Sequence, residues 1–299
     1  MTQLTDAGIA GVFDLTATGD GRHTARVDET WRGWSGPHGG VVAALLVEVA
    51  VRAAAEPLPV RAVDLRFLGR PALGSLEFVA AVTAVGRNTA VVDVRAEQGG
   101  VAVAAAAVTL GRAMPSAVPA HAGAPGQAVP APEECAEFRL PPEIVPAGAH
   151  FEIRPATDVL PLTGVEHREL CAWVTLRPRV GAGGAPTDGS AAVATADLDA
   201  PSGAGSPIDA AALPIDAAAL AILADALPPA VFPVLRAPVE APTVAFSLHL
   251  HADTAPPQPV LVRTVNASTG GGWSVDDTEL RDRDGRLLGT ARQTRRVLG

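Results

Sequence analysis

Residues 39–55 read GGVVAALLVEVAVRAAA, a nearly uninterrupted apolar segment that follows two glycines. A helix that is apolar on nearly all sides has to be covered by protein, so this segment predicts a helix enclosed by other elements. Four strand-like segments follow it and are long enough to enclose it. They are residues 60–69, 76–85, 90–97 and 101–110.

The same order of elements occurs a second time in the chain. Residues 217–227 read AAALAILADAL, again an apolar helical segment, and four more strand-like segments follow. A repeat of this length indicates two related units. The other predicted elements are the strands 243–251, 260–267, 274–281 and 287–297 and the hairpins 11–17 with 23–27 and 151–155 with 170–176.

The length of 299 residues accommodates two core-forming units. We expect an N-terminal unit at residues 1–113 and a C-terminal unit at 149–299, each an α+β unit with an apolar helix wrapped by an antiparallel sheet. Residues 114–148 are rich in Pro, Ala and Gly and predict a connector. Residues 181–206 offer too little apolar surface to offset the entropy of ordering, which predicts a low-complexity insertion.

The composition excludes several classes of function. The net charge is −9 and no lysine is present, so a nucleic-acid partner, a Schiff base and a phosphate-binding loop are not expected. No apolar run reaches the ~20 residues that cross a bilayer. Residues 1–10 lack the pattern of a secretory signal, and Cys135 and Cys171 are too few for a disulfide framework. We therefore expect a cytoplasmic protein without a membrane partner.

The start of the first helix is a candidate binding site. His38, Gly39 and Gly40 come directly before the apolar run. The first N–H groups of a helix have no partner within it, and they carry the positive end of the helix dipole. This segment therefore predicts a site for a carbonyl group or an anion.

Three polar residues stand out in the second half. Asp225 is the only ionisable residue between Asp216 and Arg236, and a buried carboxylate needs polar partners or titrates abnormally. Gln293 lies on the inward row of its predicted strand, where its amide needs hydrogen-bond partners. Thr243 falls on the opposite row by simple alternation, so it could lie beside Gln293 only if the strand has a β-bulge or if its polar row is the one that faces the helix. The alternatives are an exposed aspartate, a structural glutamine and an ordinary strand threonine.

Other chemistries have weaker support. His249 and His251 share a strand face and could bind a metal with His167 or Asp253 as a third ligand, but no Cys or Glu cluster accompanies them, and no metal is expected. The segment around Ser35 lacks the spacing of a serine nucleophile, and Cys171 lies among apolar residues.

Several of these segments resemble the double-hotdog acyl-CoA thioesterases of the TesB type. The resemblance covers most of the chain apart from the connector and the insertion. In the first half it lies in GPHGGVVAALL at 36–46 and VDLRFLGRP at 63–71. In the second half it lies in LADALPPAVF at 223–232, PTV at 242–244 and DGRLLGTARQ at 284–293.

The resemblance implies two hotdog units and a water molecule held by Asp225, Thr243 and Gln293, with acyl-CoA or a related acyl thioester as substrate and no cofactor. It implies a role in fatty acid metabolism and allows a homodimer or higher homo-oligomer. Backbone N–H groups, either near Gly39 and Gly40 or at a strand edge, would polarise the thioester carbonyl. Arginines would bind the coenzyme A phosphates, with Arg66, Arg70 and Arg87 as candidates. The alternatives are a hotdog hydratase or dehydratase and a non-catalytic protein that binds acyl thioesters or lipids.

Overall fold

The computed structural model describes residues 9–119, 121, 128–177, 215–253 and 258–298. The predicted insertion at 181–206 lies outside the described residues. Within the described part of the chain, no helix is long and apolar enough to cross a lipid bilayer. The helices are α1 (Ile9–Val12), α2 (Gly39–Ala53) and α3 (Ala217–Leu223), with short 3₁₀ turns at Glu29–Trp31, Pro132–Glu134, Pro146–His150 and Phe232–Val234.

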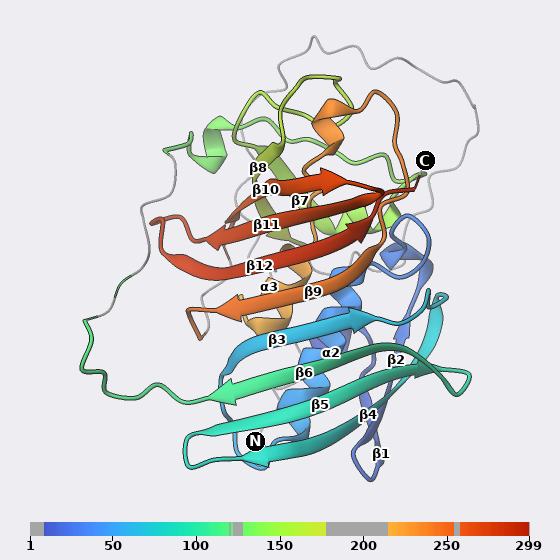
Figure 1. Cartoon of the computed structure of the whole chain (residues 1–299), viewed down its shortest axis with the longest axis vertical. Helices are drawn as coiled ribbons and strands as arrows, with labels where there is room; N and C mark the ends of the chain where they lie inside the picture. The colour runs from blue at the N-terminus through green and yellow to red at the C-terminus, as the bar shows by residue number, and fades with distance from the viewer. Residues whose placement is uncertain (1–8, 120, 122–127, 178–214, 254–257, 299) are drawn as a thin grey trace.

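Twelve strands of the described residues form one continuous antiparallel sheet in the order β1-β2-β4-β5-β6-β3-β9-β12-β11-β10-β8-β7 (Figure 1). The predicted strand at 11–17 is wrong over most of its length, because residues 11–12 belong to α1 and β1 begins at Thr16, while the other predicted strands are present with bounds that differ by a few residues. The strands are β1 (Thr16–Gly19), β2 (Arg22–Val27), β3 (Val60–Phe67), β4 (Gly74–Val85), β5 (Thr89–Gln98), β6 (Val101–Gly111), β7 (Phe151–Pro155), β8 (Glu169–Leu176), β9 (Thr243–Leu250), β10 (Val260–Gly270), β11 (Trp273–Arg281) and β12 (Leu287–Arg296).

The two halves of the sheet have the same strand order, β1-β2-β4-β5-β6-β3 and β7-β8-β10-β11-β12-β9. The corresponding strands β3 and β9 pair with each other, with Val63 opposite Leu248 and Leu65 opposite Phe246. These four side chains are almost fully buried. The predicted repeat of a hairpin, a helix and four strands is therefore present, and its two copies share one sheet.

The two central helices differ in length. α2 has 15 residues, and every residue from Gly40 to Val47 is buried. The predicted second helix extends to Leu227, but α3 has seven residues and ends at Leu223, so a long apolar helix in each unit is not confirmed. The chain tightens after Ala224, where the amides of Asp225 and Ala226 bond three residues back, and Pro228 has no N–H group that could continue a helix.

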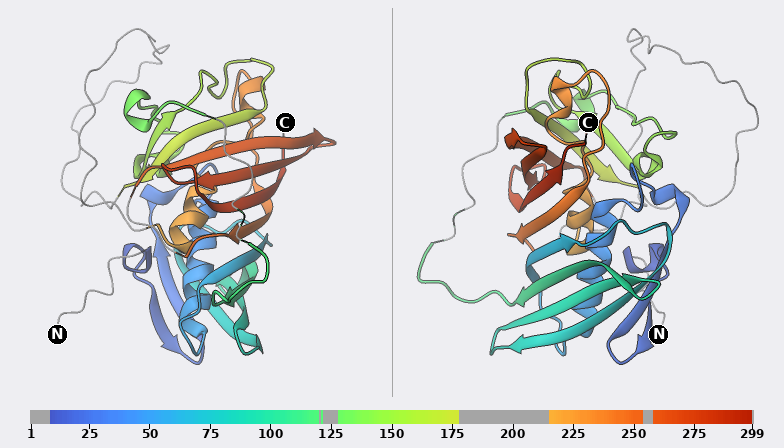
Figure 2. Two further views of the ribbon diagram at one scale, coloured as in Figure 1. Left: turned by 90° about the vertical axis from the view of Figure 1, so that its left-hand side faces the viewer. Right: turned by 45° about the vertical axis from the view of Figure 1, so that its right-hand side comes forward.

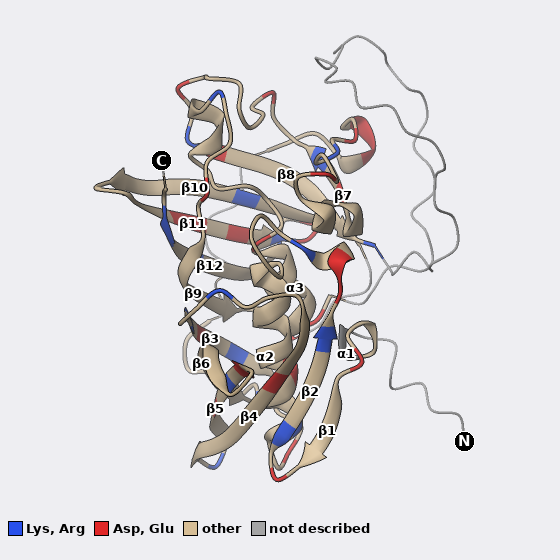
Figure 3. Cartoon of the chain, turned by 90° about the vertical axis from the view of Figure 1, so that its right-hand side faces the viewer, with Lys and Arg blue, Asp and Glu red and all other residues tan. Residues whose placement is uncertain are grey.

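The sheet curves around α2 and α3, which lie side by side in its concave face (Figures 2 and 3). Alternating strand residues turn toward the helices, as in β5, where Ala90, Val92, Val94 and Ala96 are buried. Arg, Asp and Glu residues are interspersed over the strands and loops in Figure 3. This packing brings the start of α2 next to the end of α3.

Candidate active site

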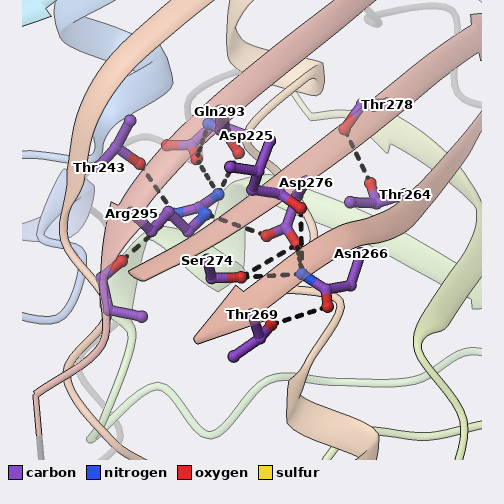
Figure 4. Close-up of polar contacts among 12 residues, drawn as sticks. Asp225, Thr243, Thr264, Asn266, Thr269, Ser274, Asp276, Thr278, Gln293 and Arg295 are labelled. Carbon is purple, nitrogen blue, oxygen red and sulfur yellow. Dashed lines mark hydrogen bonds and ion pairs between the residues drawn. The ribbon is translucent and has the colours of Figure 1, made fainter. Parts of the chain in front are cut away.

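Asp225 follows α3 by two residues and turns its carboxylate toward the start of α2. Its Oδ1 accepts hydrogen bonds from Gln293 Nε2 at 2.7 Å and from Arg295 Nη2 at 3.1 Å. Its Oδ2 accepts from the Gly40 backbone N–H at 2.9 Å and lies 3.8 Å from His38 Nδ1. The carboxylate thus has donors from both halves of the chain (Figure 4 shows the contacts within the second half).

These contacts explain how a buried carboxylate stays ionised. Burial by itself would raise the pKa of Asp225, but His38 in its protonated form, the Arg295 cation and the hydrogen bonds together lower it below its ordinary value. The pKa of His38 is lowered as well, mainly because the ring is buried, so His38 is neutral at pH 7. Arg295 is therefore the cation that keeps Asp225 negatively charged.

Gln293 and Thr243 reach this cluster from β12 and β9. Gln293 is 2% exposed, so its inward position is confirmed. Between β12 and β9 the register shifts, because Arg295 pairs with Thr243 while Thr294 pairs with Ala245. This irregularity is the bulge that Thr243 required. The Thr243 hydroxyl accepts a hydrogen bond from Arg295 Nη1 at 2.9 Å, so Thr243 joins Asp225 and Gln293 through Arg295.

His38, Gly39 and Gly40 lie where the sequence predicts them, at the start of α2. His38 is the N-cap residue, and its Nδ1 atom is buried without a hydrogen bond. At Gly39 a Cβ atom would lie 2.8 Å from Asp225 Oδ2, so only glycine lets the backbone approach the carboxylate this closely. All six predicted site residues therefore lie in one region that includes both halves.

Two residues of the cluster were not predicted, Arg295 and Asp276. Arg295 is 7% exposed and Asp276 is fully buried, and Arg295 Nε lies 3.4 Å from Asp276 Oδ2. Strand alternation could have predicted Arg295, because it is two residues after Gln293 and lies on the same inward row. Asp276 faces Gln293 on the neighbouring strand β11, but only the strand register brings it there.

A cavity of about 170 Å³ opens beside this cluster. Asp225, Arg295 and Thr243 line it, as do His38 and Gly39. Of the three arginines proposed for phosphate binding, Arg70 lines the cavity and forms an ion pair with Glu240 at 3.3 Å. The apolar part of the wall consists mainly of aromatic residues, prolines and aliphatic residues: Trp34, Pro37, Phe67, Leu140, Val145, Phe151, Leu227, Pro228, Pro229 and Phe232.

A cysteine nucleophile has no support. Cys171 is 4% exposed and lies outside the cavity. Burial, aided by Glu169, raises the pKa of its thiol to about 11, so the thiol is protonated at pH 7. Cys171 is therefore not a candidate nucleophile for the cavity.

Comparison with known proteins places the chain in a family. Residues 27–111 match the family model for the acyl-CoA thioesterase N-terminal domain, and residues 204–297 match that for the acyl-CoA thioesterase C-terminal domain. Together the two matches include more than half of the chain. Among curated proteins the comparison finds no significant match.

Solved structures share the fold over nearly the whole length. A conserved protein with a hotdog fold from Alicyclobacillus acidocaldarius is 21% identical with a TM-score of 0.78, covering 100% of this chain and 99% of that one. A TesB protein from Mycobacterium avium is 16% identical with a TM-score of 0.70, and acyl-CoA thioesterase II from Mycobacterium marinum is 15% identical with a TM-score of 0.68. Both cover 97% of this chain and 98% of theirs. The chain belongs to the acyl-CoA thioesterase family and is an acyl-CoA thioesterase, an enzyme that hydrolyses thioesters.

Proposed function

We propose that Asp225 is the general base of this thioesterase and that Thr243 and Gln293 orient the attacking water. The observation that supports this most directly is an ionised carboxylate in the wall of the cavity, held between the Gly40 N–H and the Gln293 amide. A base must be unprotonated at the working pH, and the lowered pKa of Asp225 meets that requirement.

In the proposed reaction the oxygen of the water forms a bond to the thioester carbonyl carbon while Asp225 takes one of its protons. The carbonyl electron pair moves onto oxygen and gives a tetrahedral intermediate. When this intermediate collapses, the carbon–sulfur bond breaks and the proton held by Asp225 passes to the leaving thiolate. The products are a carboxylic acid and coenzyme A, and the Asp225 carboxylate is regenerated.

Two groups in the cavity wall are suited to stabilise the oxyanion. The Gly39 N–H stands at the first position of α2, where no acceptor exists within the helix. Thr243 accepts its hydrogen bond from Arg295 through oxygen, which leaves its own hydroxyl proton able to donate. Donors fixed in place before the reaction lower the energy of the charge that develops on the carbonyl oxygen.

The cavity wall also suits the two ends of the substrate. The aromatic and proline side chains, among them Trp34, Phe67 and Phe232, would bury the acyl chain. Arg70 is 56% exposed in its side chain and would bind a coenzyme A phosphate after leaving Glu240. Acyl-CoA fits both features, and a role in fatty acid metabolism follows from that substrate.

The organisation around the site fits two hotdog units. We propose boundaries at 1–113 and 149–299, with 114–148 as the connector, because each range contains one copy of the repeated strand order. The site then lies between the units, since Gly40 belongs to the first and Asp225 to the second. A cytoplasmic location agrees with the free thiols of Cys135 and Cys171.

Asp225→Asn tests the proposed base. The variant keeps the size and part of the hydrogen bonding of the side chain but cannot take a proton, so kcat/KM should fall by on the order of 100-fold or more. Release of free thiol from acyl-CoA substrates of several chain lengths measures this. Asp216→Asn is the matched control, because Asp216 caps the other end of α3 and Asn caps a helix equally well. Equal turnover by Asp225→Asn and the wild type would remove Asp225 from the mechanism.

One observation favours a hydratase as the second candidate. His38 lies 3.8 Å from Asp225, and an acid and a base side by side could move water onto or off an unsaturated acyl thioester. Incubation with an enoyl-CoA distinguishes the two reactions, because a hydratase consumes the double bond without releasing thiol. The thioesterase proposal expects thiol release and an intact double bond.

A further inference from the structure

Arg295 contacts all three residues proposed to hold the catalytic water. Its Nη2 donates to Asp225 Oδ1 at 3.1 Å and to Gln293 Oε1, and its Nη1 donates to Thr243 Oγ1 at 2.9 Å. We infer that Arg295 is the positioning residue of this site, which keeps Asp225 ionised and sets the orientation of Gln293 and Thr243. This inference rests on the proposed function of Asp225.

Both terminal nitrogens of the Arg295 guanidinium group donate to two acceptors each within the protein. A guanidinium has five N–H donors in a fixed fork. Besides the three contacts above, Nη1 lies 3.5 Å from the Ala241 carbonyl oxygen and Nε lies 3.4 Å from Asp276 Oδ2. Because both Nη atoms have acceptors in the protein and Nε faces the Asp276 carboxylate without a hydrogen bond, Arg295 acts through its neighbours and does not bind the substrate carbonyl.

The contacts of Arg295 determine the orientation of the Gln293 amide and of the Thr243 hydroxyl group. Gln293 could turn either end of its amide toward Asp225. Because Oε1 accepts from Arg295, the NH₂ group has to face the carboxylate, to which it donates at 2.7 Å. The hydroxyl proton of Thr243 is likewise directed away from Arg295. One cation thus fixes the direction of both hydrogen-bonding groups.

The position of Arg295 is itself fixed on the side away from the cavity. Asp276 is fully buried, and its Oδ1 accepts hydrogen bonds from Asn266 at 3.0 Å and from Ser274 at 3.5 Å (Figure 4). Arg295 therefore lies between two carboxylates, one in the cavity wall and one behind it. A buried cation with partners on both sides is held more firmly than a single surface ion pair.

Among the described residues, three charged or titratable side chains lie close to Asp225 or directly behind its partner Arg295. They are His38 from the start of α2, Arg295 from β12 and, behind Arg295, Asp276 from β11. Arg70 and Glu240 line the same cavity but neutralise each other as an ion pair. Replacing Arg295 by an uncharged residue removes the positive charge beside Asp225 and leaves the Asp276 carboxylate behind it, and both changes favour protonation of Asp225.

The test is the pH dependence of kcat/KM for thiol release from acyl-CoA by the full-length protein. In the wild type kcat/KM should fall at low pH as Asp225 becomes protonated, and this fall is the acid limb of the profile. In Arg295→Met the acid limb should shift to higher pH by at least about one unit, because an opposite charge within 4–6 Å lowers a carboxyl pKa by 1–3 units. Arg295→Lys retains the charge but loses the fork. Its acid limb should stay near that of the wild type while kcat falls about tenfold or more. Arg263→Met is the control, because it removes a comparable pair with Glu169 outside the cavity.

His38 has to be separated from Asp225 in this experiment, because Arg295 also lowers the pKa of His38. The profiles are therefore repeated with His38→Gln in the wild-type and Arg295→Met backgrounds, and the upward shift should persist. An unchanged acid limb in Arg295→Met would overturn the inference.

Folding failure is a distinct outcome with its own measurement. If Arg295→Met does not fold, Arg295→Lys decides alone, because full kcat in that variant would also overturn the role of the fork. The two proposals fail separately. Activity in Asp225→Asn refutes the base, whereas an inactive Asp225→Asn together with an unmoved limb in Arg295→Met refutes only the positioning role.

Discussion

His38 is a neutral side chain that the fold buries beside a carboxylate. Its ring is 8% exposed, and Phe151 packs against it with ring centroids 5.5 Å apart. Burial opposes protonation more strongly than Asp225 favours it, so the pKa of His38 is lowered. A group of this kind makes stability depend on pH near neutrality.

We expect His38 to destabilise the fold as the pH falls from 8 to 5. Its pKa is lower in the folded protein than the value of about 6.5 in the unfolded chain, so the unfolded chain binds the proton first. The free energy of unfolding should therefore decrease as the pH falls through about 6.5. Thermal midpoints measured across this range should fall more steeply for the wild type than for His38→Gln.

The control for this prediction is His121→Gln, because His121 is exposed and its variant should follow the wild type. Asp225 affects the free energy of unfolding in a separate, more acidic pH range. Its folded pKa is lowered, so its contribution to stability is present above its unfolded value of about 3.9 and is lost as the pH falls below that value. Identical slopes for His38→Gln and the wild type between pH 8 and 5 would contradict the role of His38.

At the scale of elements, the two central helices meet at a glycine. A Cβ atom at Gly40 would lie 2.8 Å from Ile222 Cα and 2.9 Å from the Ala221 carbonyl oxygen, both in α3. Backbone atoms of a helix cannot move aside as a side chain can. The close approach of α2 and α3 therefore depends on this one residue, and it brings the Gly40 N–H to Asp225.

Alanine substitutions at the two adjacent glycines should have different effects. Gly40→Ala has to separate α2 from α3 and should destabilise the protein by about 1–3 kcal/mol. Gly39→Ala contacts the Asp225 carboxylate instead, so it should lower kcat/KM with a smaller loss of stability. Thermal unfolding and thiol-release assays of both variants measure this contrast. A more severe loss of stability in Gly39→Ala than in Gly40→Ala would show that the helix contact is misassigned.

The whole molecule is held together across the middle of its sheet. β3 and β9 pair through buried apolar residues, α2 packs on α3, and Trp31 stacks on His150 with ring centroids 3.7 Å apart. Trp31 belongs to the first proposed unit and His150 to the second. Neither half can therefore unfold without exposing apolar surface of the other.

We expect the two halves to unfold in a single transition. Trp31 and Trp34 report on the first half, and Trp173 and Trp273 report on the second. In each of two variants, the tryptophans of one half are replaced by Phe, so that fluorescence reports on the other half only. Denaturant unfolding of each variant is followed by fluorescence and by far-ultraviolet circular dichroism. In each variant the two transitions should coincide, as a two-state process requires. A fluorescence transition that precedes loss of secondary structure in either variant would indicate units that unfold independently.

Local patterns in the sequence were sufficient for much of this molecule. The apolar run of α2, the strand alternation and the repeated order of elements predicted a helix, four following strands and a second copy. They also singled out Asp225, Gln293 and the start of α2, because a polar group among apolar neighbours stands out without knowledge of the fold. These features follow from the periodicity of a helix or strand, which neighbouring residues alone determine.

Contacts between distant segments depended on tertiary structure. The pairing of β3 with β9, the bulge that turns Thr243 inward and the approach of Gly40 to Ile222 determine which polar groups meet. Arg295 and Asp276 join the site only because the registers of β9, β11 and β12 align them. The short α3 likewise reflects its tightened end and the prolines that follow. The physical reason is that register and packing are set by surfaces from both halves, which no single segment contains.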